Sequence, residues 1–111
     1  MPKTPRKAVR SVRERRFALA GNVLRTSGSM YWEYLGEFED ACAKLISSRW
    51  NRIEVDLMDV DFMSSVYFGP LSDMLLKAAK LNKTVVIRAT PDIGWLFETI
   101  GGGKFLELDI L

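Results

Sequence analysis

The segment Thr84-Val85-Val86-Ile87 places four β-branched residues in a row. β-Branched side chains favour extended backbone, and a continuous run of them predicts a strand that is buried on both faces. Strands of this kind belong to parallel sheets, in which crossover helices join neighbouring strands. The run therefore predicts an α/β chain in which strands alternate with helices.

Apolar residues that recur at steps of three and four predict the helices. The first such pattern spans 31–45 and the second 71–79. A third helix should begin at Thr90-Pro91-Asp92, with a capping threonine, a proline at the first helical position and an acid at the positive end of the helix dipole. Gly101-Gly102-Gly103 should end it. The stripes are Tyr31, Tyr34, Leu35, Phe38, Ala41, Cys42 and Leu45, then Leu71, Met74, Leu75, Ala78 and Ala79, then Ile93, Leu96, Phe97 and Ile100.

Three further strands are predicted. Phe17–Ala20 precedes a turn at Gly21, Ile53–Leu57 alternates apolar with polar residues, and Phe105–Leu108 can form a short last strand. The segment 26–29, Thr-Ser-Gly-Ser, has the composition of a turn. The resulting order of elements predicts a single α/β domain with a mostly parallel sheet of four or five strands and right-handed crossovers.

The charges are divided unevenly along the 111 residues. Residues 1–16 carry seven Lys/Arg and one acid, whereas 17–111 carry nine Lys/Arg and thirteen acids. We therefore expect a basic N-terminal arm, 1–16, before an α/β domain, 17–111. Val9 and Val12 could make part of the arm a strand; otherwise it should be disordered. A basic arm could contact nucleic acid or an anionic membrane, but it lacks interleaved aromatic residues, and we do not expect nucleic acid to be the partner.

The chain has no histidine and one cysteine. Ser-His-Asp and Cys-His nucleophiles and the usual zinc sites are therefore excluded, and no intrachain disulfide can form. We expect no enzyme, no cofactor and no small-molecule substrate. No apolar run is long enough to span a membrane, and the basic N-terminus lacks the pattern of a secretory signal. These features predict a cytoplasmic protein.

The segment "DVDFMSSVYFGP", 59–70, places two serines between a strand and a helix. The carboxyl ends of strands are where open α/β sheets present functional groups. A serine at this place can cap the helix, or it can be a modification site, where a phosphate adds a charge of about −1.5 to −2. The acids Asp56, Asp59 and Asp61 could suggest a magnesium or phosphoacceptor pocket, but we expect them to solvate the strand end.

The stretch from "IEVDLMDVDFMSSVYFGPLSDML" to "TVVIRATPDIGWLFETIGGGKFLEL" resembles the STAS domain, named for sulfate transporters and anti-sigma factor antagonists. The order of elements matches from about Phe17 to the C-terminus. In that family, an apolar strand leads to Asp-Ser-Ser/Thr-Gly-aliphatic-Gly at a helix start. The resemblance implies that Ser65 is the phosphorylated serine, with Ser64 as second choice, and that Gly69 is the motif's second glycine. The sequence departs from the motif at Ser64, which replaces the acid, and at Val66 and Tyr67.

The resemblance also implies a function. Anti-sigma factor antagonists are regulatory proteins, and a partner serine kinase docks on the serine loop, phosphorylates it and is thereby released. We expect Asp59, Asp61, Tyr67 and Phe68 to form the docking surface, with Tyr67 and Phe68 exposed. We also expect Gly69 to cap the helix and Pro70 to take its first position. One alternative is a STAS adaptor that docks on a transporter or sensory complex without phosphorylation. Another is nucleic-acid binding through the arm.

Overall fold

The computed structural model describes residues 16–93 and 106–110. Two predicted regions lie outside the described residues. One is the arm except for Arg16, and the other is 94–105, which holds the last residues of the third helical stripe and the triple glycine. The elements are β1 (Phe17–Ala20), β2 (Val23–Met30), η1 (Trp32–Tyr34), α2 (Leu35–Ile46), β3 (Arg52–Met63), η2 (Ser65–Tyr67), α3 (Phe68–Lys80), β4 (Thr84–Ala89) and β5 (Leu106–Ile110).

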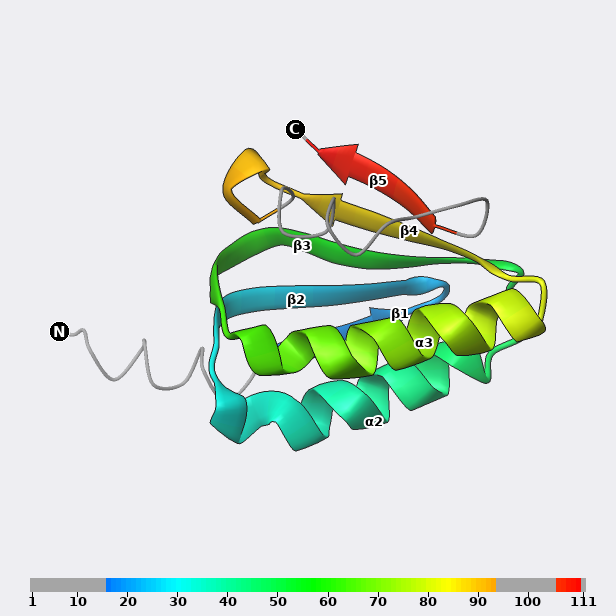
Figure 1. Ribbon diagram of the computed structural model, residues 1–111, viewed down its shortest axis with the longest axis horizontal. Coiled ribbons are helices and arrows are strands. Elements are labelled where there is room, and N and C mark those ends of the chain that lie inside the picture. Colours follow the sequence, from blue (N-terminus) through cyan, green and yellow to red (C-terminus); the bar gives the residue numbers. More distant parts are fainter. Residues whose placement is uncertain (1–15, 94–105, 111) are drawn as a thin grey trace, which may run out of the picture.

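The strands form one five-stranded sheet in the order β1-β2-β3-β4-β5. β1 and β2 are an antiparallel hairpin that turns at Gly21, and the other neighbours are parallel. The helices α2 and α3 are the crossovers from β2 to β3 and from β3 to β4, and they lie side by side on one face of the sheet (Figure 1). This arrangement confirms the predicted α/β class with a mostly parallel sheet.

The prediction of a turn at residues 26–29 was wrong, because these residues lie inside β2. Thr26 pairs with Phe17 of β1, and residues 27–29 pair with β3. Thr26 is buried, and its hydroxyl donates to the Asp56 carbonyl at 3.2 Å. Gly28 adopts a φ of 81° beside a shift in the register between β2 and β3. Pairing between strands thus outweighed the local preference of Ser and Gly for turns.

β3 is longer than the predicted strand, since it continues through Asp59–Met63. Two register shifts interrupt its pairing with β2. Each shift inserts one extra residue into β3, so the residues after it face the opposite side of the sheet from the one that strict alternation predicts. Leu57, Val60 and Met63 are therefore all buried although they are three residues apart. A strand buries every second residue, not every third. The second half of β3 was therefore not predicted as a strand from the sequence.

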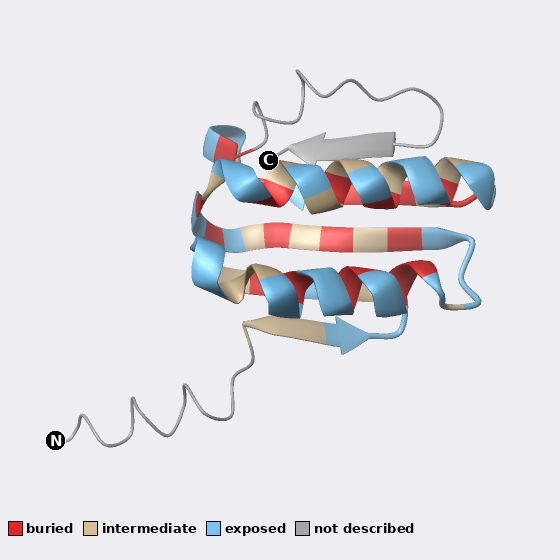
Figure 2. Cartoon of the chain, turned by 60° about the horizontal axis from the view of Figure 1, so that its bottom comes forward, coloured by how far each residue is buried: buried red, intermediate tan, exposed pale blue. Residues whose placement is uncertain are grey.

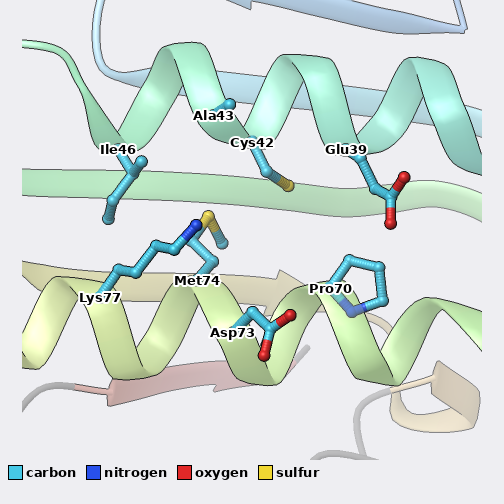
Figure 3. A pocket seen from close by; sticks show the side chains of 8 residues that line it. All are labelled: Glu39, Cys42, Ala43, Ile46, Pro70, Asp73, Met74 and Lys77. Carbon is cyan, nitrogen blue, oxygen red and sulfur yellow. The ribbon is translucent and has the colours of Figure 1, made fainter.

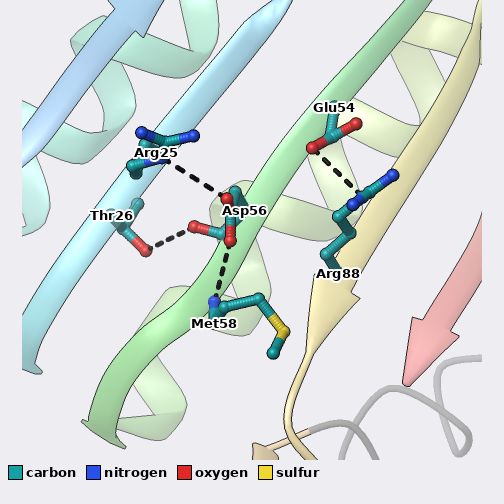
Figure 4. Close-up of polar contacts among 6 residues, drawn as sticks. All are labelled: Arg25, Thr26, Glu54, Asp56, Met58 and Arg88. Atoms are coloured by element: carbon teal, nitrogen blue, oxygen red, sulfur yellow. Dashed lines mark hydrogen bonds and ion pairs between the residues drawn. The ribbon is translucent and has the colours of Figure 1, made fainter. Parts of the chain in front are cut away.

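Asp56 supports the first shift in the sheet. Its carboxylate accepts from the backbone N–H of Met58 at 2.9 Å and contacts the Arg25 guanidinium at 3.4 Å. A second pair, Glu54 with Arg88 at 3.2 Å, lies on the same face (Figure 4). This face is opposite α2 and α3, because the intervening residues of β3 face the helical core. Asp56, which we expected to solvate the end of the strand, is therefore a structural partner within the sheet.

The core lies between the sheet and the two helices, where the buried faces of α2 and α3 meet β3 (Figure 2). The predicted stripes of both helices contribute to it, with Phe38, Ala41, Cys42 and Leu45 from α2 and Leu71, Met74 and Ala78 from α3. Val85, Val86 and Ile87 of β4 are all buried, as the β-branched run predicted. Among the described residues, no helix is long and apolar enough to cross a membrane.

Gly28 should be intolerant of a side chain. A Cβ atom there would lie 2.8 Å from the Arg16 Nη1 atom, at a φ that L-residues rarely adopt. We expect Gly28→Ala to lower the free energy of unfolding by about 1–3 kcal/mol. Gly36→Ala is the matched control: no atom lies within 4 Å of the added carbon, and it should raise helix stability by about 0.5–1 kcal/mol. Urea denaturation measures both, and equal effects would contradict this explanation.

Cys42 should be unreactive in the folded chain. Burial, with a smaller contribution from the charge of Glu39, raises the pKa of its thiol from 9.0 to about 12. We expect labelling by a thiol reagent at about pH 8 to be at least about a hundredfold slower than in the unfolded chain, because only the thiolate reacts. Since the folded pKa is raised, this group's contribution to stability is complete below pH 9 and is lost as the pH rises towards 12. Equal labelling rates in the folded and unfolded chain would contradict the burial of Cys42.

Candidate functional site

The two candidate serines lie where β3 ends and η2 begins. The Ser64 backbone N–H donates to the Met30 carbonyl at 3.0 Å, which ties the end of β3 to the end of β2. The Ser64 hydroxyl accepts from the Val66 N–H at 3.5 Å, so this serine caps η2. Ser65 is the first residue of η2 and is exposed. Of the two roles that the sequence left open, the cap belongs to Ser64, whereas Ser65 faces solvent.

The predicted exposure of Tyr67 was wrong. Its side chain is fully buried, and its ring packs edge-on against Phe38 with 5.1 Å between centroids. Its hydroxyl donates to the Tyr31 carbonyl at 2.6 Å. Phe68 is only partly exposed and packs against the core. Neither ring is an exposed anchor: both lie on the helical turn that faces the sheet, where apolar area is removed from water.

Charges of both signs act on the Tyr67 hydroxyl. Burial raises the pKa of its hydroxyl, the positive charge of Arg16 acts in the opposite direction, and the negative charges of Glu37 and Glu33 raise it further. These acids belong to η1 and the first turn of α2. The start of the first crossover helix therefore lies beside the segment that carries the serines.

The helix start also differs from the predicted one. α3 begins at Phe68, directly after η2, so Gly69 and Pro70 are its second and third residues. Gly69 therefore does not cap the helix. Proline is tolerated in the first turn of a helix, where it does not break the pattern of hydrogen bonds. Since η2 and α3 follow one another directly, residues 65–68 form a helical turn that leads into α3.

The predicted acids lie next to the serines. Asp59 and Asp61 are both exposed on the last part of β3. The Asp61 carboxylate accepts a hydrogen bond of 2.7 Å from the hydroxyl of Ser29 on β2. Together with η1 and η2, the ends of β2 and β3 form one surface, which we call the serine end (residues 29–34 and 59–68). Both predicted acids belong to this surface.

Sequence reasoning missed the exposed apolar residues of the serine end. Tyr31, Trp32, Phe62 and Val66 are all exposed, Trp32 at 71% of its surface. The rings of Tyr31 and Phe62 touch, with 5.4 Å between centroids. The sequence pattern placed Tyr31 in a helical stripe and gave Phe62 no role at the surface. One sequence signal could have indicated the exposure of Phe62. It follows the acid Asp61 in a stretch where apolar and polar residues no longer alternate.

Arg16 fastens the start of the described chain to the serine end. Its guanidinium donates to the carbonyls of Ser29 at 2.8 Å and Ser27 at 3.3 Å. The same group lies over the Tyr34 ring, 3.9 Å from the centroid. Its backbone carbonyl also accepts from the Ser27 N–H at 3.1 Å. The described chain therefore begins at the same end of the domain as Ser65.

A groove between α2 and α3 is a second candidate (Figure 3). Its volume is about 150 Å³, and its lining residues include Cys42, Met74, Asp73 and Lys77. Ligand pockets are typically about 300–1,000 Å³. The groove is smaller than this range and its charges are mixed, so we assign no ligand to it. Within 16–93 and 106–110, no group of three or more Cys, Asp or Glu residues could hold a metal ion.

Comparisons with known proteins give no match to a family model and no match among curated sequences. Solved structures do match. A provisionally assigned anti-sigma factor antagonist of Thermotoga maritima has a TM-score of 0.66 at 11% identity over 84% of this chain and 83% of that one. SiaC of Pseudomonas aeruginosa has a TM-score of 0.58 at 16% identity over 81% of each chain. The fold of this chain is therefore STAS-like, as its sequence predicted.

Proposed function

We propose that this chain is a regulatory protein-interaction module that docks its partner at the serine end. The observation that carries the proposal is the position of Ser65, exposed at the first residue of η2 and bordered by exposed apolar side chains. The carboxyl ends of the strands are where open α/β sheets bind their ligands. The STAS-like fold, shared with a provisionally assigned anti-sigma factor antagonist, supports a regulatory role over an enzymatic one.

Ser65 is the phosphoacceptor in this proposal, and the partner is an anti-sigma factor or a related protein with serine kinase activity. A phosphate on Ser65 would lie at the start of a helical segment, where backbone N–H groups favour negative charge. It would also add a charge of about −1.5 to −2 next to the exposed Asp59 and Asp61. A partner packed against the unmodified serine would have to desolvate this charge, so phosphorylation should release it.

Mass spectrometry of the chain isolated from its own cells tests the acceptor. The tryptic peptide 53–77 contains both serines. We expect one phosphate on Ser65, which Ser65→Ala abolishes and Ser64→Ala keeps. Ser64→Ala should instead lower the free energy of unfolding by about 1 kcal/mol, because it removes the cap of η2. A phosphate on Ser64 would contradict the assignment.

The same mass spectrometry distinguishes phosphorylation of Ser65 from docking without phosphorylation. If the chain remains unphosphorylated both free and in its complex, the module acts as an adaptor. Nucleic-acid binding through the arm stays a prediction, since 1–15 lie outside the described residues. It requires binding that weakens steeply with salt and disappears when the arm's basic residues are replaced.

A further inference from the structure

The aromatic side chains of the serine end form a patch that is independent of the serines. Tyr31 and Phe62 are in contact, each with 47% of its surface exposed, and Trp32 follows Tyr31 with 71% exposed. Contiguous apolar residues on a surface mark interaction sites, and Trp and Tyr are the residues that most often dominate binding energy. No described element covers this patch, whereas the neighbouring rings of Phe38 and Tyr67 are completely buried.

Carboxylates border the patch. Glu33 follows Trp32 in η1, and Asp61 precedes Phe62 on β3, with Asp59 two residues further back; all three are exposed. The Asp61 carboxylate is held at the patch by its hydrogen bond of 2.7 Å from the hydroxyl of Ser29, the residue that pairs with Phe62 across the sheet. A partner that approaches the aromatic rings therefore meets negative charge.

The nearest described cation does not offset this charge at the surface. The guanidinium of Arg16 donates to the Ser29 and Ser27 carbonyls and lies over the ring of Tyr34. These contacts hold it partly buried against the end of β2. Among the described residues, its position leaves Glu33, Asp59 and Asp61 as the charges at the patch.

We propose that the serine end docks a partner segment that is both apolar and basic. A large aliphatic or aromatic side chain of the segment packs on Trp32 and Phe62, and flanking Lys or Arg residues face the three carboxylates. An Arg of the segment can in addition stack on the Trp32 ring, which is the best aromatic partner of a cation. The inference rests on the proposed function and specifies the chemistry of the partner at the same surface.

Selection from an unbiased library of 12-residue peptides displayed on phage tests the inference on the full chain. We expect the enriched peptides to carry a large apolar residue flanked by Lys or Arg. As synthetic peptides, they should bind at least about tenfold more weakly to Trp32→Ala. The double variant Asp59→Asn/Asp61→Asn should weaken binding several-fold and flatten its dependence on salt, because the removed charges contribute through screened electrostatic attraction.

The matched controls replace exposed residues of the same types elsewhere. Leu81→Ser removes an exposed apolar side chain at the far end of α3, and Asp40→Asn and Asp73→Asn remove exposed acids of the two helices. All three should leave peptide binding unchanged. Equal losses in these controls would overturn the assignment to the serine end.

Three other results would overturn the inference. Peptides without basic residues that bind the serine end independently of salt would remove the charge complementarity but leave the proposed docking surface intact. Peptides that bind outside the serine end, or a selection that enriches no peptide, would show that the serine end is not a peptide-docking site. Concentration-dependent dimerisation that Trp32→Ala abolishes would show that a second copy of this chain occupies the patch. Phosphorylation of Ser65 is measured separately, so its absence does not affect these outcomes.

Discussion

Replacing Tyr67 with alanine should lower the free energy of unfolding by about 3–5 kcal/mol. The ring is fully buried and stands at the end of a row of aromatic contacts, from Phe17 to Phe38 at 5.5 Å and from Phe38 to Tyr67 at 5.1 Å between centroids. The substitution would leave a cavity between α2, α3 and the sheet. It would also remove the hydrogen bond that joins η2 to the Tyr31 carbonyl. Urea denaturation of the purified variant measures the loss.

The conservative substitution separates packing from hydrogen bonding. Tyr67→Phe keeps the ring and removes the hydroxyl that donates to the Tyr31 carbonyl at 2.6 Å. We expect a loss of about 0.5–1.5 kcal/mol. An exposed anchor residue would tolerate both changes with little effect on stability. A loss below about 1 kcal/mol in Tyr67→Ala would therefore show that Tyr67 faces solvent and would restore it as a candidate docking residue.

Lys83→Met should lower the free energy of unfolding by roughly 2–3 kcal/mol. Lys83 is buried, and its ammonium group donates to the carbonyls of Ser48 at 2.7 Å and Trp50 at 2.6 Å. These carbonyls follow the end of α2, where helix carbonyls have no partner within the helix. Methionine fills a similar volume but cannot donate. A hydrogen bond to a charged group is worth about 1.5–3 kcal/mol, and burial of the apolar methionine offsets part of the loss of the two bonds.

The control for this substitution is Lys80→Met, at the exposed end of α3. It should change stability by roughly 0.5 kcal/mol or less, as is usual for surface positions. Thermal and urea unfolding of both variants give the comparison. If both lysines prove equally replaceable, the buried ammonium does not fasten α2 to the start of β4.

The sequence predicted the parts of the fold that depend on regular periodicity. The helical stripes of α2 and α3 and the buried run of β4 appear where the spacing of apolar residues placed them. The second half of β3 could not be predicted in this way. Its two register shifts give the buried residues Leu57, Val60 and Met63 a spacing that belongs neither to a strand nor to a helix. The turn-like composition of 26–29 misled for a related reason: pairing with strands distant in sequence held these residues in β2.

The candidate site was predicted in part. The order of strand and helix placed the serines at the carboxyl end of the sheet, and Asp59 and Asp61 lie beside them on the surface. The orientation of aromatic side chains was not predictable, because a helical turn directs Tyr67 inward and a register shift directs Phe62 outward. The inward turn of Tyr67 leaves no local trace in the sequence, and the register shift at Phe62 shows only as a break in the alternation of apolar and polar residues. The burial of Tyr67 is the main correction that the structure makes to the predicted docking surface.

The position of Val66, next to Ser65, allows a direct test of docking at the serine end. Val66 and Leu81 have similar exposure, 42% and 55%, at opposite ends of the η2–α3 segment. A photo-crosslinking amino acid is placed at each position in turn, and the chain is expressed in its own cells. Crosslinking then captures the proteins that contact each surface. We predict a discrete protein adduct from position 66, strongly reduced by Ser65→Glu, and none of the same size from position 81. Adducts that are equal at both positions, or an adduct from position 66 that Ser65→Glu leaves unchanged, would contradict a docking surface switched at Ser65.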